Sequence, residues 1–239
     1  MGLLKTVLLL IVTVVVIYLV YTYFFTKKVH LSGLNSGTKP ITIKSTKFPS
    51  NNSSSNYAYS IWFNVSNWKY RLGEKKVLLN RESNGISNPL ITLAGYENNI
   101  HVNVSTYPKS NSKYQKHDET SSNHDCVIRN FPLQKWVNLI VSLNSRTLDI
   151  YLDGKLVRTC VLPGVAKVHP HADLYITPGG GFSGHTSNLQ YFSNPLNPQE
   201  AYNIYKSGYS SLGVGSFLEK YKIKVSYLVN NNEEGSLEI

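Results

Sequence analysis

The chain has 239 residues, of which 41% are hydrophobic and only 16% charged, and its formal net charge is +10. The composition argues for a packed globule and the length for one membrane segment plus one domain of about 180 residues, while 17 Tyr and 3 Trp favour strands over helices. The positive charge suits anionic lipid or an acidic protein, but the lysines are dispersed and no nucleic-acid motif is present, so nucleic acid is an unlikely partner by this criterion.

An uncharged segment opens the chain, from Thr6 to Phe25. About twenty apolar residues in a helix span a hydrocarbon core of roughly 30 Å. Tyrosines gather at the C-terminal end of the segment and Lys27 and Lys28 follow it, as at a membrane surface. A cleaved signal peptide would have a shorter apolar region that ends in small residues. The sequence therefore predicts that residues 1–28 form a transmembrane anchor in a lipid bilayer.

The charges that flank this segment predict its orientation. Lysines are more numerous on its C-terminal side than on its N-terminal side, which predicts that the main domain faces the cytosol. Four glycosylation triplets favour the luminal side instead, at Asn51, Asn52, Asn64 and Asn103. In a chain so rich in Asn, Ser and Thr such triplets arise by chance, so the charges decide this prediction.

Residues 29–56 are rich in Ser, Asn, Gly and Lys, a composition that predicts a flexible linker. Within them, Ile41–Lys44 alternates apolar and polar residues and could add an edge strand.

From residue 57 onward, alternating and β-branched runs recur at the spacing typical of a sandwich or barrel. The predicted strands are 57–65, 76–80, 90–94, 99–105, 126–129, 136–143, 147–152, 155–161 and 173–177. Asp153 and Gly154 supply the positive φ angles of a tight hairpin turn between two of them. The predicted fold class is all-β and antiparallel.

One short helix is also predicted, after Asn197 as the N-cap and with Glu200 at the capping-box position, ending near Gly208. Its one apolar face predicts packing on the rim of the sandwich. Residues 221–229 alternate as a strand, and residues 230–239 form a polar, frayed tail.

Two segments, Pro132–Asn138 and Leu148–Lys155, resemble the signature of laminin-G-like, concanavalin A-like jelly-roll domains, in which a Trp opens one strand and an Asp-Gly hairpin follows. The blocks Cys126–Gly164, Thr177–Gly184 and Asn197–Ala201 resemble a group of such proteins in giant nucleocytoplasmic large DNA viruses.

The resemblance covers residues 57–229 and implies a two-sheet jelly-roll sandwich. It also implies a structural virion protein, a minor capsid component whose sandwich links the inner membrane to capsid or other virion proteins. The alternative is a membrane-bound lectin that binds glycans.

Catalytic chemistry is not expected. The fold also occurs in glycoside hydrolases, but retaining hydrolysis needs two carboxylates about 5–5.5 Å apart on one face, and no predicted strand carries such a pair. Asp149 and Asp153 are the closest approach to such a pair, but Asp153 is already part of the hairpin turn. The expectation is therefore no enzyme, no catalytic residue and no cofactor.

A metal site is not expected either. The candidate ligands His124, Asp125, Cys126, His169 and His171 lack the tight paired spacing of zinc sites. Surface loop histidines are the favoured interpretation.

Cys126 and Cys160 are the two cysteines of the chain. The favoured interpretation is a disulfide between neighbouring strands, provided that their Cα atoms approach within about 7 Å. Two buried free thiols, as a reducing cytosol would maintain, are the alternative.

Two loops offer the mixture of aromatic and hydrogen-bonding side chains that glycan sites use. The candidate glycan or partner contacts are Trp68, Tyr70, Arg71, Phe182 and His185. For Trp68, the favoured interpretation is a core residue that covers an edge of the sandwich.

Overall fold

The computed structural model describes residues 10, 12–17, 28–49, 55–107, 122–209, 224–229 and 232–238. Residues 10 and 12–17 are helical, whereas Thr6 and Phe25, the ends of the predicted anchor, lie outside the described residues. Within the part of the chain that is described, no helix has both the length and the apolar character needed to cross a bilayer.

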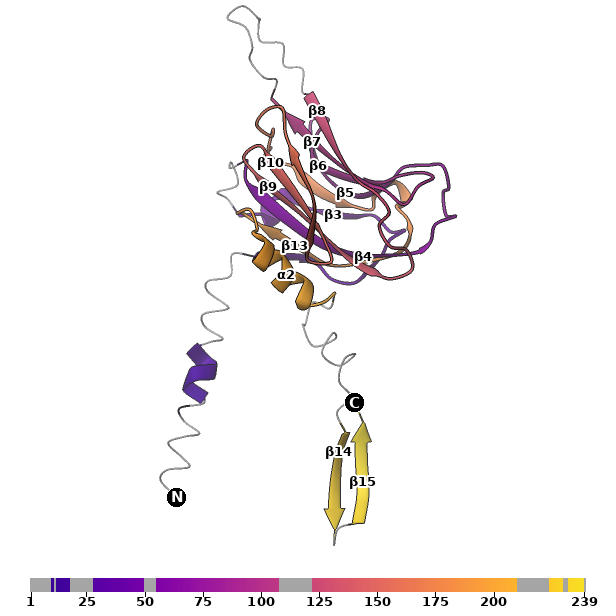
Figure 1. The fold of residues 1–239 in the computed structure, drawn as a ribbon, viewed down its shortest axis with the longest axis vertical. Coiled ribbons are helices and arrows are strands. Elements are labelled where there is room, and N and C mark those ends of the chain that lie inside the picture. The colour runs from indigo at the N-terminus through magenta and orange to yellow at the C-terminus, as the bar shows by residue number, and fades with distance from the viewer. Residues whose placement is uncertain are drawn as a thin grey trace, which may run out of the picture.

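Two antiparallel sheets lie face to face and form a sandwich (Figure 1). One sheet has the strand order β1 (Lys28–Ser32), β13 (Ser183–Phe192), β4 (Tyr57–Asn67), β9 (Trp136–Asn144), β10 (Thr147–Leu152) and β11 (Lys155–Val161), and β2 (Asn35–Ser36) also pairs with β13. The other has the order β3 (Ile41–Ile43), β12 (Asp173–Ile176), β5 (Lys76–Ser83), β6 (Ile86–Leu93), β7 (Ile100–Thr106) and β8 (Ser122–Ile128). Short 3-10 helices are η1 (Ser45–Lys47) and η2 (Pro178–Gly180). The predicted all-β, two-sheet antiparallel sandwich is confirmed.

The core fills the space between the two sheets, and the alternation of side chains along each strand decides which residues enter it. In β12, Leu174 and Ile176 are fully buried, whereas Asp173 and Tyr175 between them are only half-buried. A shift of one residue would exchange the two sets, so the buried pair fixes the register. It thereby places Asp173 and Tyr175 on the outer face of the six-stranded sheet.

The hairpin between β10 and β11 has the predicted turn. Leu152 pairs with Lys155, and the two residues between them, Asp153 and Gly154, have φ angles of 49° and 74°. Two successive positive φ angles match the twist of the flanking strands. A Cβ atom at Gly154 would lie 2.9 Å from Cβ of Tyr205, so glycine also allows the close approach of the helix.

The linker predicted for residues 29–56 is wrong over the part that the structure describes. β1 pairs with β13 and extends the seven-stranded sheet, while β3 pairs with β12 and extends the other. Ile43 and Phe48 are 7% and 6% exposed and belong to the core. The predicted edge strand at Ile41–Lys44 is thus present as β3. β1 was not predicted, because the composition of this segment is polar.

Helix α2 (Pro198–Lys206) begins with the predicted capping box: the Asn197 side chain accepts from the backbone N–H of Glu200, whose carboxylate accepts from the backbone N–H of Asn197. The helix lies on the outer face of the seven-stranded sheet rather than on the rim (Figure 1). Ala201 packs there against Ile140 and Tyr151. The predicted position is wrong because this sheet is apolar on both faces at β9 and β10, which periodicity in the helix alone does not show.

Two further elements differ from the predictions. β13 was not predicted, because Ser, Gly, Asn and His interrupt its apolar pattern, yet it is a central strand between β1 and β4. The tail predicted to fray forms β15 (Asn232–Glu238), which pairs with β14 (Lys224–Val229).

Cys126 and Cys160 form a disulfide, with their Cα atoms 6.3 Å apart. The predicted bridge is present, and it joins β8 and β11, which are the edge strands of opposite sheets. The bond therefore joins the two layers of the sandwich at one side. Both cysteines are buried.

Replacing both cysteines with serine should lower the free energy of unfolding by about 3–4 kcal/mol, because a bridge across a sequence separation of 34 restricts the unfolded chain. Urea unfolding of the wild type and the double variant measures this difference. A reducing agent should destabilise only the wild type, and equal stability of the two proteins without reductant would contradict the prediction.

Candidate functional site

The two loops predicted to offer contacts lie against each other in the structure. Tyr70 Oη donates to the carbonyl of Gly180 at 3.2 Å, and the Arg71 guanidinium donates to the carbonyl of Gly179. Arg71 also forms an ion pair with Glu74 at 2.6 Å. These two side chains therefore hold one loop against the other.

The other three predicted contact residues, Trp68, Phe182 and His185, differ in how exposed they are. Trp68 is half-buried against the core, and its Nε1 donates to the carbonyl of Tyr96 at 3.0 Å. Phe182 is fully buried between the sheets and cannot contact a ligand, so that prediction is wrong. The cause is the turn before it, where Gly181 has a φ of +40° and directs the chain inward. His185 is exposed on β13.

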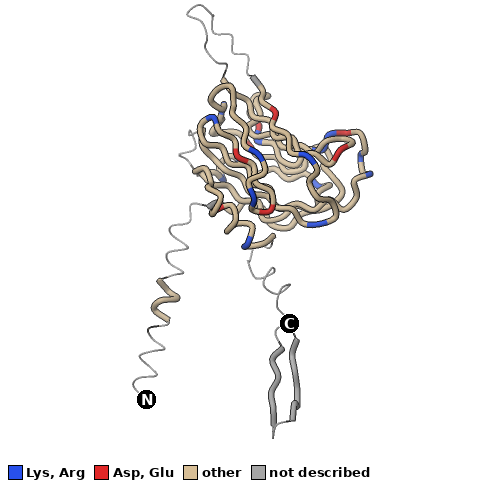
Figure 2. Tube along the Cα trace, in the orientation of Figure 1, with Lys and Arg blue, Asp and Glu red and all other residues tan. Residues whose placement is uncertain are grey.

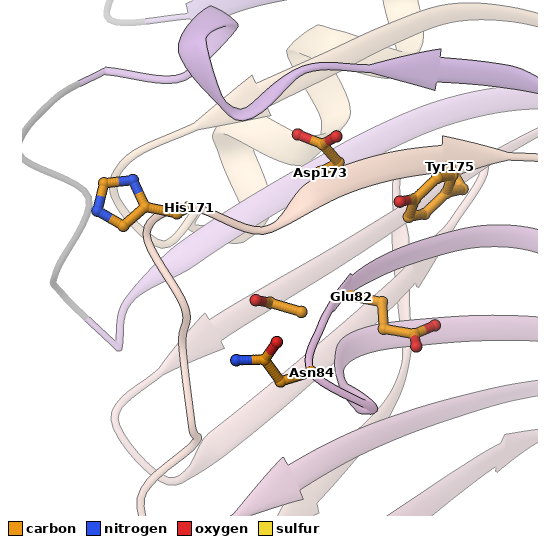
Figure 3. Close-up of a pocket in the computed structure, with 6 residues that line it drawn as sticks. Glu82, Asn84, His171, Asp173 and Tyr175 are labelled. Carbon is orange, nitrogen blue, oxygen red and sulfur yellow. The ribbon is translucent and has the colours of Figure 1, made fainter.

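A pocket that none of these residues lines opens elsewhere, on the outer face of the six-stranded sheet (Figure 3). It has a volume of about 370 Å³ and is lined by Glu82, Ser83, Asn84, His171, Asp173 and Tyr175. We call it the β5–β12 pocket. Its lining combines two carboxyl groups, an amide, a hydroxyl, an imidazole and one aromatic ring.

Strand pairing brings the two carboxyl groups together. Asp173 of β12 lies directly opposite Glu82 of β5 in the antiparallel register, so both side chains project from the same face of the sheet. Asn84 follows in the turn between β5 and β6, where it and Gly85 have φ angles of 52° and 73°. Asn tolerates this left-handed conformation better than most residues, which explains its place at the mouth of the pocket.

The segment predicted to be a linker supplies the charge that neutralises Asp173. Lys44 Nζ lies 2.9 Å from one carboxylate oxygen of Asp173, and the backbone N–H of Ser45 donates to the other at 2.8 Å. The hydrogen bond from Lys44 lowers the pKa of Asp173, and the bond from Ser45 lowers it further. The same contact raises the pKa of Lys44. Asp173 is therefore ionised at neutral pH.

Glu82 also serves as a hydrogen-bond acceptor, since its Oε2 accepts from Asn80 Nδ2 at 2.7 Å. The pocket thus presents two acceptor carboxyl groups, one of them neutralised by a lysine, beside the Tyr175 ring. A lining of hydrogen-bonding groups with one aromatic ring suits a polar small molecule, whose orientation such groups would fix. The single sequence carried no signal for this arrangement, because the register between two distant strands creates it.

The candidate metal ligands are dispersed. Asp125 lies 2.8 Å from Nδ1 of His101, Cys126 is in the disulfide, and His171 lines the β5–β12 pocket. Among the described residues, no group of three or more His, Cys, Asp or Glu side chains is placed to hold a metal ion.

Basic residues do not mark a site either. Figure 2 shows Lys and Arg distributed around the sandwich rather than in one stripe, with acidic residues among them.

Comparison with solved structures shows the fold. The binding domain of botulinum neurotoxin serotype D is 14% identical, with a TM-score of 0.55, over 73% of this chain and 41% of that one. The binding domain of botulinum neurotoxin DC, solved in complex with SialylT and with rat synaptotagmin II, is 14% identical, with a TM-score of 0.53, over 74% of this chain and 41% and 42% of those chains, respectively. This chain therefore spans less than half the length of these structures.

Comparison with curated protein sequences found no match. A family model does match, over residues 35–201, and its start before residue 57 agrees with the inclusion of β2 and β3 in the sandwich. On this match the chain belongs to the concanavalin A-like lectin/glucanase superfamily, in its laminin G-like branch.

Proposed function

We propose that this chain is a non-catalytic carbohydrate-binding protein, that its sugar site is the β5–β12 pocket, and that its N-terminal segment holds it at a membrane. The observation that carries the proposal is the lining of that pocket, in which the carboxyl groups of Glu82 and Asp173 and the amide of Asn84 occur together with the ring of Tyr175. Carboxylates and amides bind sugar hydroxyls through directional hydrogen bonds, and an aromatic ring covers the apolar C–H face of a sugar.

The state of the two carboxyl groups supports binding rather than hydrolysis. Acid–base hydrolysis by a carboxyl pair requires that one member carries a proton for the leaving group. Asp173 is held ionised by Lys44 and Ser45, and Glu82 accepts a hydrogen bond from Asn80. The contacts from Lys44 and Ser45 favour the ionised form of Asp173, which suits an acceptor of hydrogen bonds from sugar hydroxyl groups rather than a proton donor.

The relatives supply a second line of support. The superfamily includes lectins, and one structural neighbour was solved with SialylT and another with a protein receptor, synaptotagmin II. Those ligands belong to the toxin domains. For this chain they favour a binding role over a catalytic one.

The disulfide bears on the side of the membrane. The lysines after the anchor predict the cytosolic side, but cytosolic thiols are kept reduced, whereas the sandwich contains a buried bridge between its sheets. We therefore propose that the sandwich is displayed on the oxidising side of its membrane, where glycans are exposed.

A virion scaffold that links a membrane to capsid proteins is the function implied by the resemblance to viral proteins. It remains a prediction, and cross-links from the sandwich to capsid subunits in intact particles would support it.

Glycan binding is tested with the full-length chain in detergent on a glycan array. Replacing Glu82 with Gln should weaken binding to the recognised glycans about 10- to 100-fold, because a charged hydrogen bond to the ligand is lost. Glu97 is the matched control, since it also accepts from a nearby Asn outside the pocket, and Glu97→Gln should bind normally.

Two results would contradict this proposal. Equal binding by wild type and Glu82→Gln would exclude the β5–β12 pocket as the sugar site. Release of reducing ends from a bound polysaccharide would show that the protein is an enzyme.

The electrostatics of the pocket can be tested separately. An NMR titration should give Asp173 a pKa below its ordinary value of about 3.9, and Lys44→Met should raise it toward that value. Because the folded-state pKa is lowered, the ion pair stabilises the fold above the unfolded-state pKa, and this stabilisation is lost as pH falls through the folded-state pKa. Lys39→Met, at a neighbouring exposed lysine, should leave the titration unchanged.

The orientation is tested by protease digestion of sealed microsomes that contain the newly made chain. The sandwich should be protected until detergent opens the vesicles. Digestion of the sandwich in intact vesicles would place it on the cytosolic side instead.

A further inference from the structure

The outer face of the seven-stranded sheet contains two buried polar groups that lack partners. Trp62 on β4 and Asn138 on β9 are directly opposite each other in the register, and their side chains are 5% and 0% exposed. Within the described part of the chain, neither Trp62 Nε1 nor Asn138 Oδ1 has a hydrogen-bond partner. One atom is a donor and the other an acceptor, and unpaired groups of this kind are rare in folded interiors.

The ring of Tyr209 contacts the indole rings of Trp62 and Trp136 on this face. It stacks on Trp136 with the ring centroids 4.7 Å apart and the planes 5° from parallel. It also meets Trp62 edge-on, at 6.2 Å and 67°. Tyr209 thus lies face to face with Trp136 and edge-on to Trp62, which is itself stacked on Tyr205, and we call the space that the Tyr209 ring fills the slot.

Polar contacts from β13 attach the chain at Gly208 and Tyr209. Ser187 Oγ donates to the carbonyl of Tyr209 at 2.7 Å, and Asn188 Nδ2 donates to the carbonyl of Gly208 at 2.9 Å. Gly208 has a φ of +79°, a conformation in which glycine lets the chain turn sharply after α2. Tyr209 itself is only half-buried and is not part of either core cluster.

We propose that the slot between Trp62 and Trp136 is a second binding site, for a ring of a neutral sugar, and that Tyr209 is its removable plug. A sugar ring has an apolar face that would replace the Tyr209 ring on Trp136. It also carries hydroxyl groups that both donate and accept, so it satisfies Asn138 Oδ1 and Trp62 Nε1 together. A phenyl ring has an apolar face but no hydroxyl groups that could pair with these two atoms.

The plug acts through a population shift. The ligand binds the form in which Tyr209 has left the slot, so its apparent affinity is reduced by the small fraction of molecules in that form. Removing the Tyr209 ring abolishes this competition and leaves the two tryptophans in place. This site is separate from the β5–β12 pocket, which lies on the other sheet.

The test compares the full-length wild type with Tyr209→Ala on an array of neutral glycans, with circular dichroism as the check of folding. Tyr209→Ala should bind at least one neutral glycan about tenfold more tightly than the wild type, and the same glycan should blue-shift the tryptophan fluorescence. Tyr209→Phe keeps the plug and should match the wild type. Trp136→Ala in the Tyr209→Ala background should lose the gained binding.

Ser187→Ala provides a second route, because it removes one attachment of the plug without changing the slot, and it should give a smaller gain. Glu82→Gln should leave the gained binding unchanged, which separates this site from the proposed pocket. Identical array profiles for wild type, Ser187→Ala and Tyr209→Ala would overturn the proposal, and so would a gain that survives the loss of Trp136.

Discussion

β12 pairs with β5 on one side and with β3 on the other, and the pocket on the outer face of the six-stranded sheet depends on both pairings. β5 on one side sets Asp173 opposite Glu82, and β3 on the other side brings Lys44 to Asp173. Two like charges directly across a pair of strands repel each other. Lys44, which directly follows β3, offsets this repulsion, so the segment that contains β3 contributes to the acidic pocket.

The two outer faces of the sandwich are organised differently. The six-stranded sheet exposes a polar hollow, whereas the seven-stranded sheet is covered by α2, which packs on Ile140 and Tyr151 and stacks Tyr205 on Trp62. A covered face carries strands that are buried on both sides, as β4 and β9 are here. One fold therefore combines a pocket that is open to solvent with an aromatic cluster that its own chain covers.

Local chemistry made part of this fold predictable. The Asp153-Gly154 turn, the capping box at Asn197 and the alternating strands follow from contacts within a few residues, and the structure has all of them. β13 was missed because central strands need not alternate, and the β5–β12 pocket was missed because a register between strands about 90 residues apart decides it. The position of α2 depended on which sheet face was apolar, a property of several strands together.

The bridge from Cys126 to Cys160 encloses the segment that forms β9 and β10 and the exposed turns beside them. A protease that cuts the backbone once at Gln134 or Lys135, both exposed, would leave two fragments that are still covalently joined. The strands of each fragment would also stay hydrogen-bonded to their neighbours in the two sheets. A single nick in this region would thus change the connectivity of the chain while the assembled domain stays in one piece.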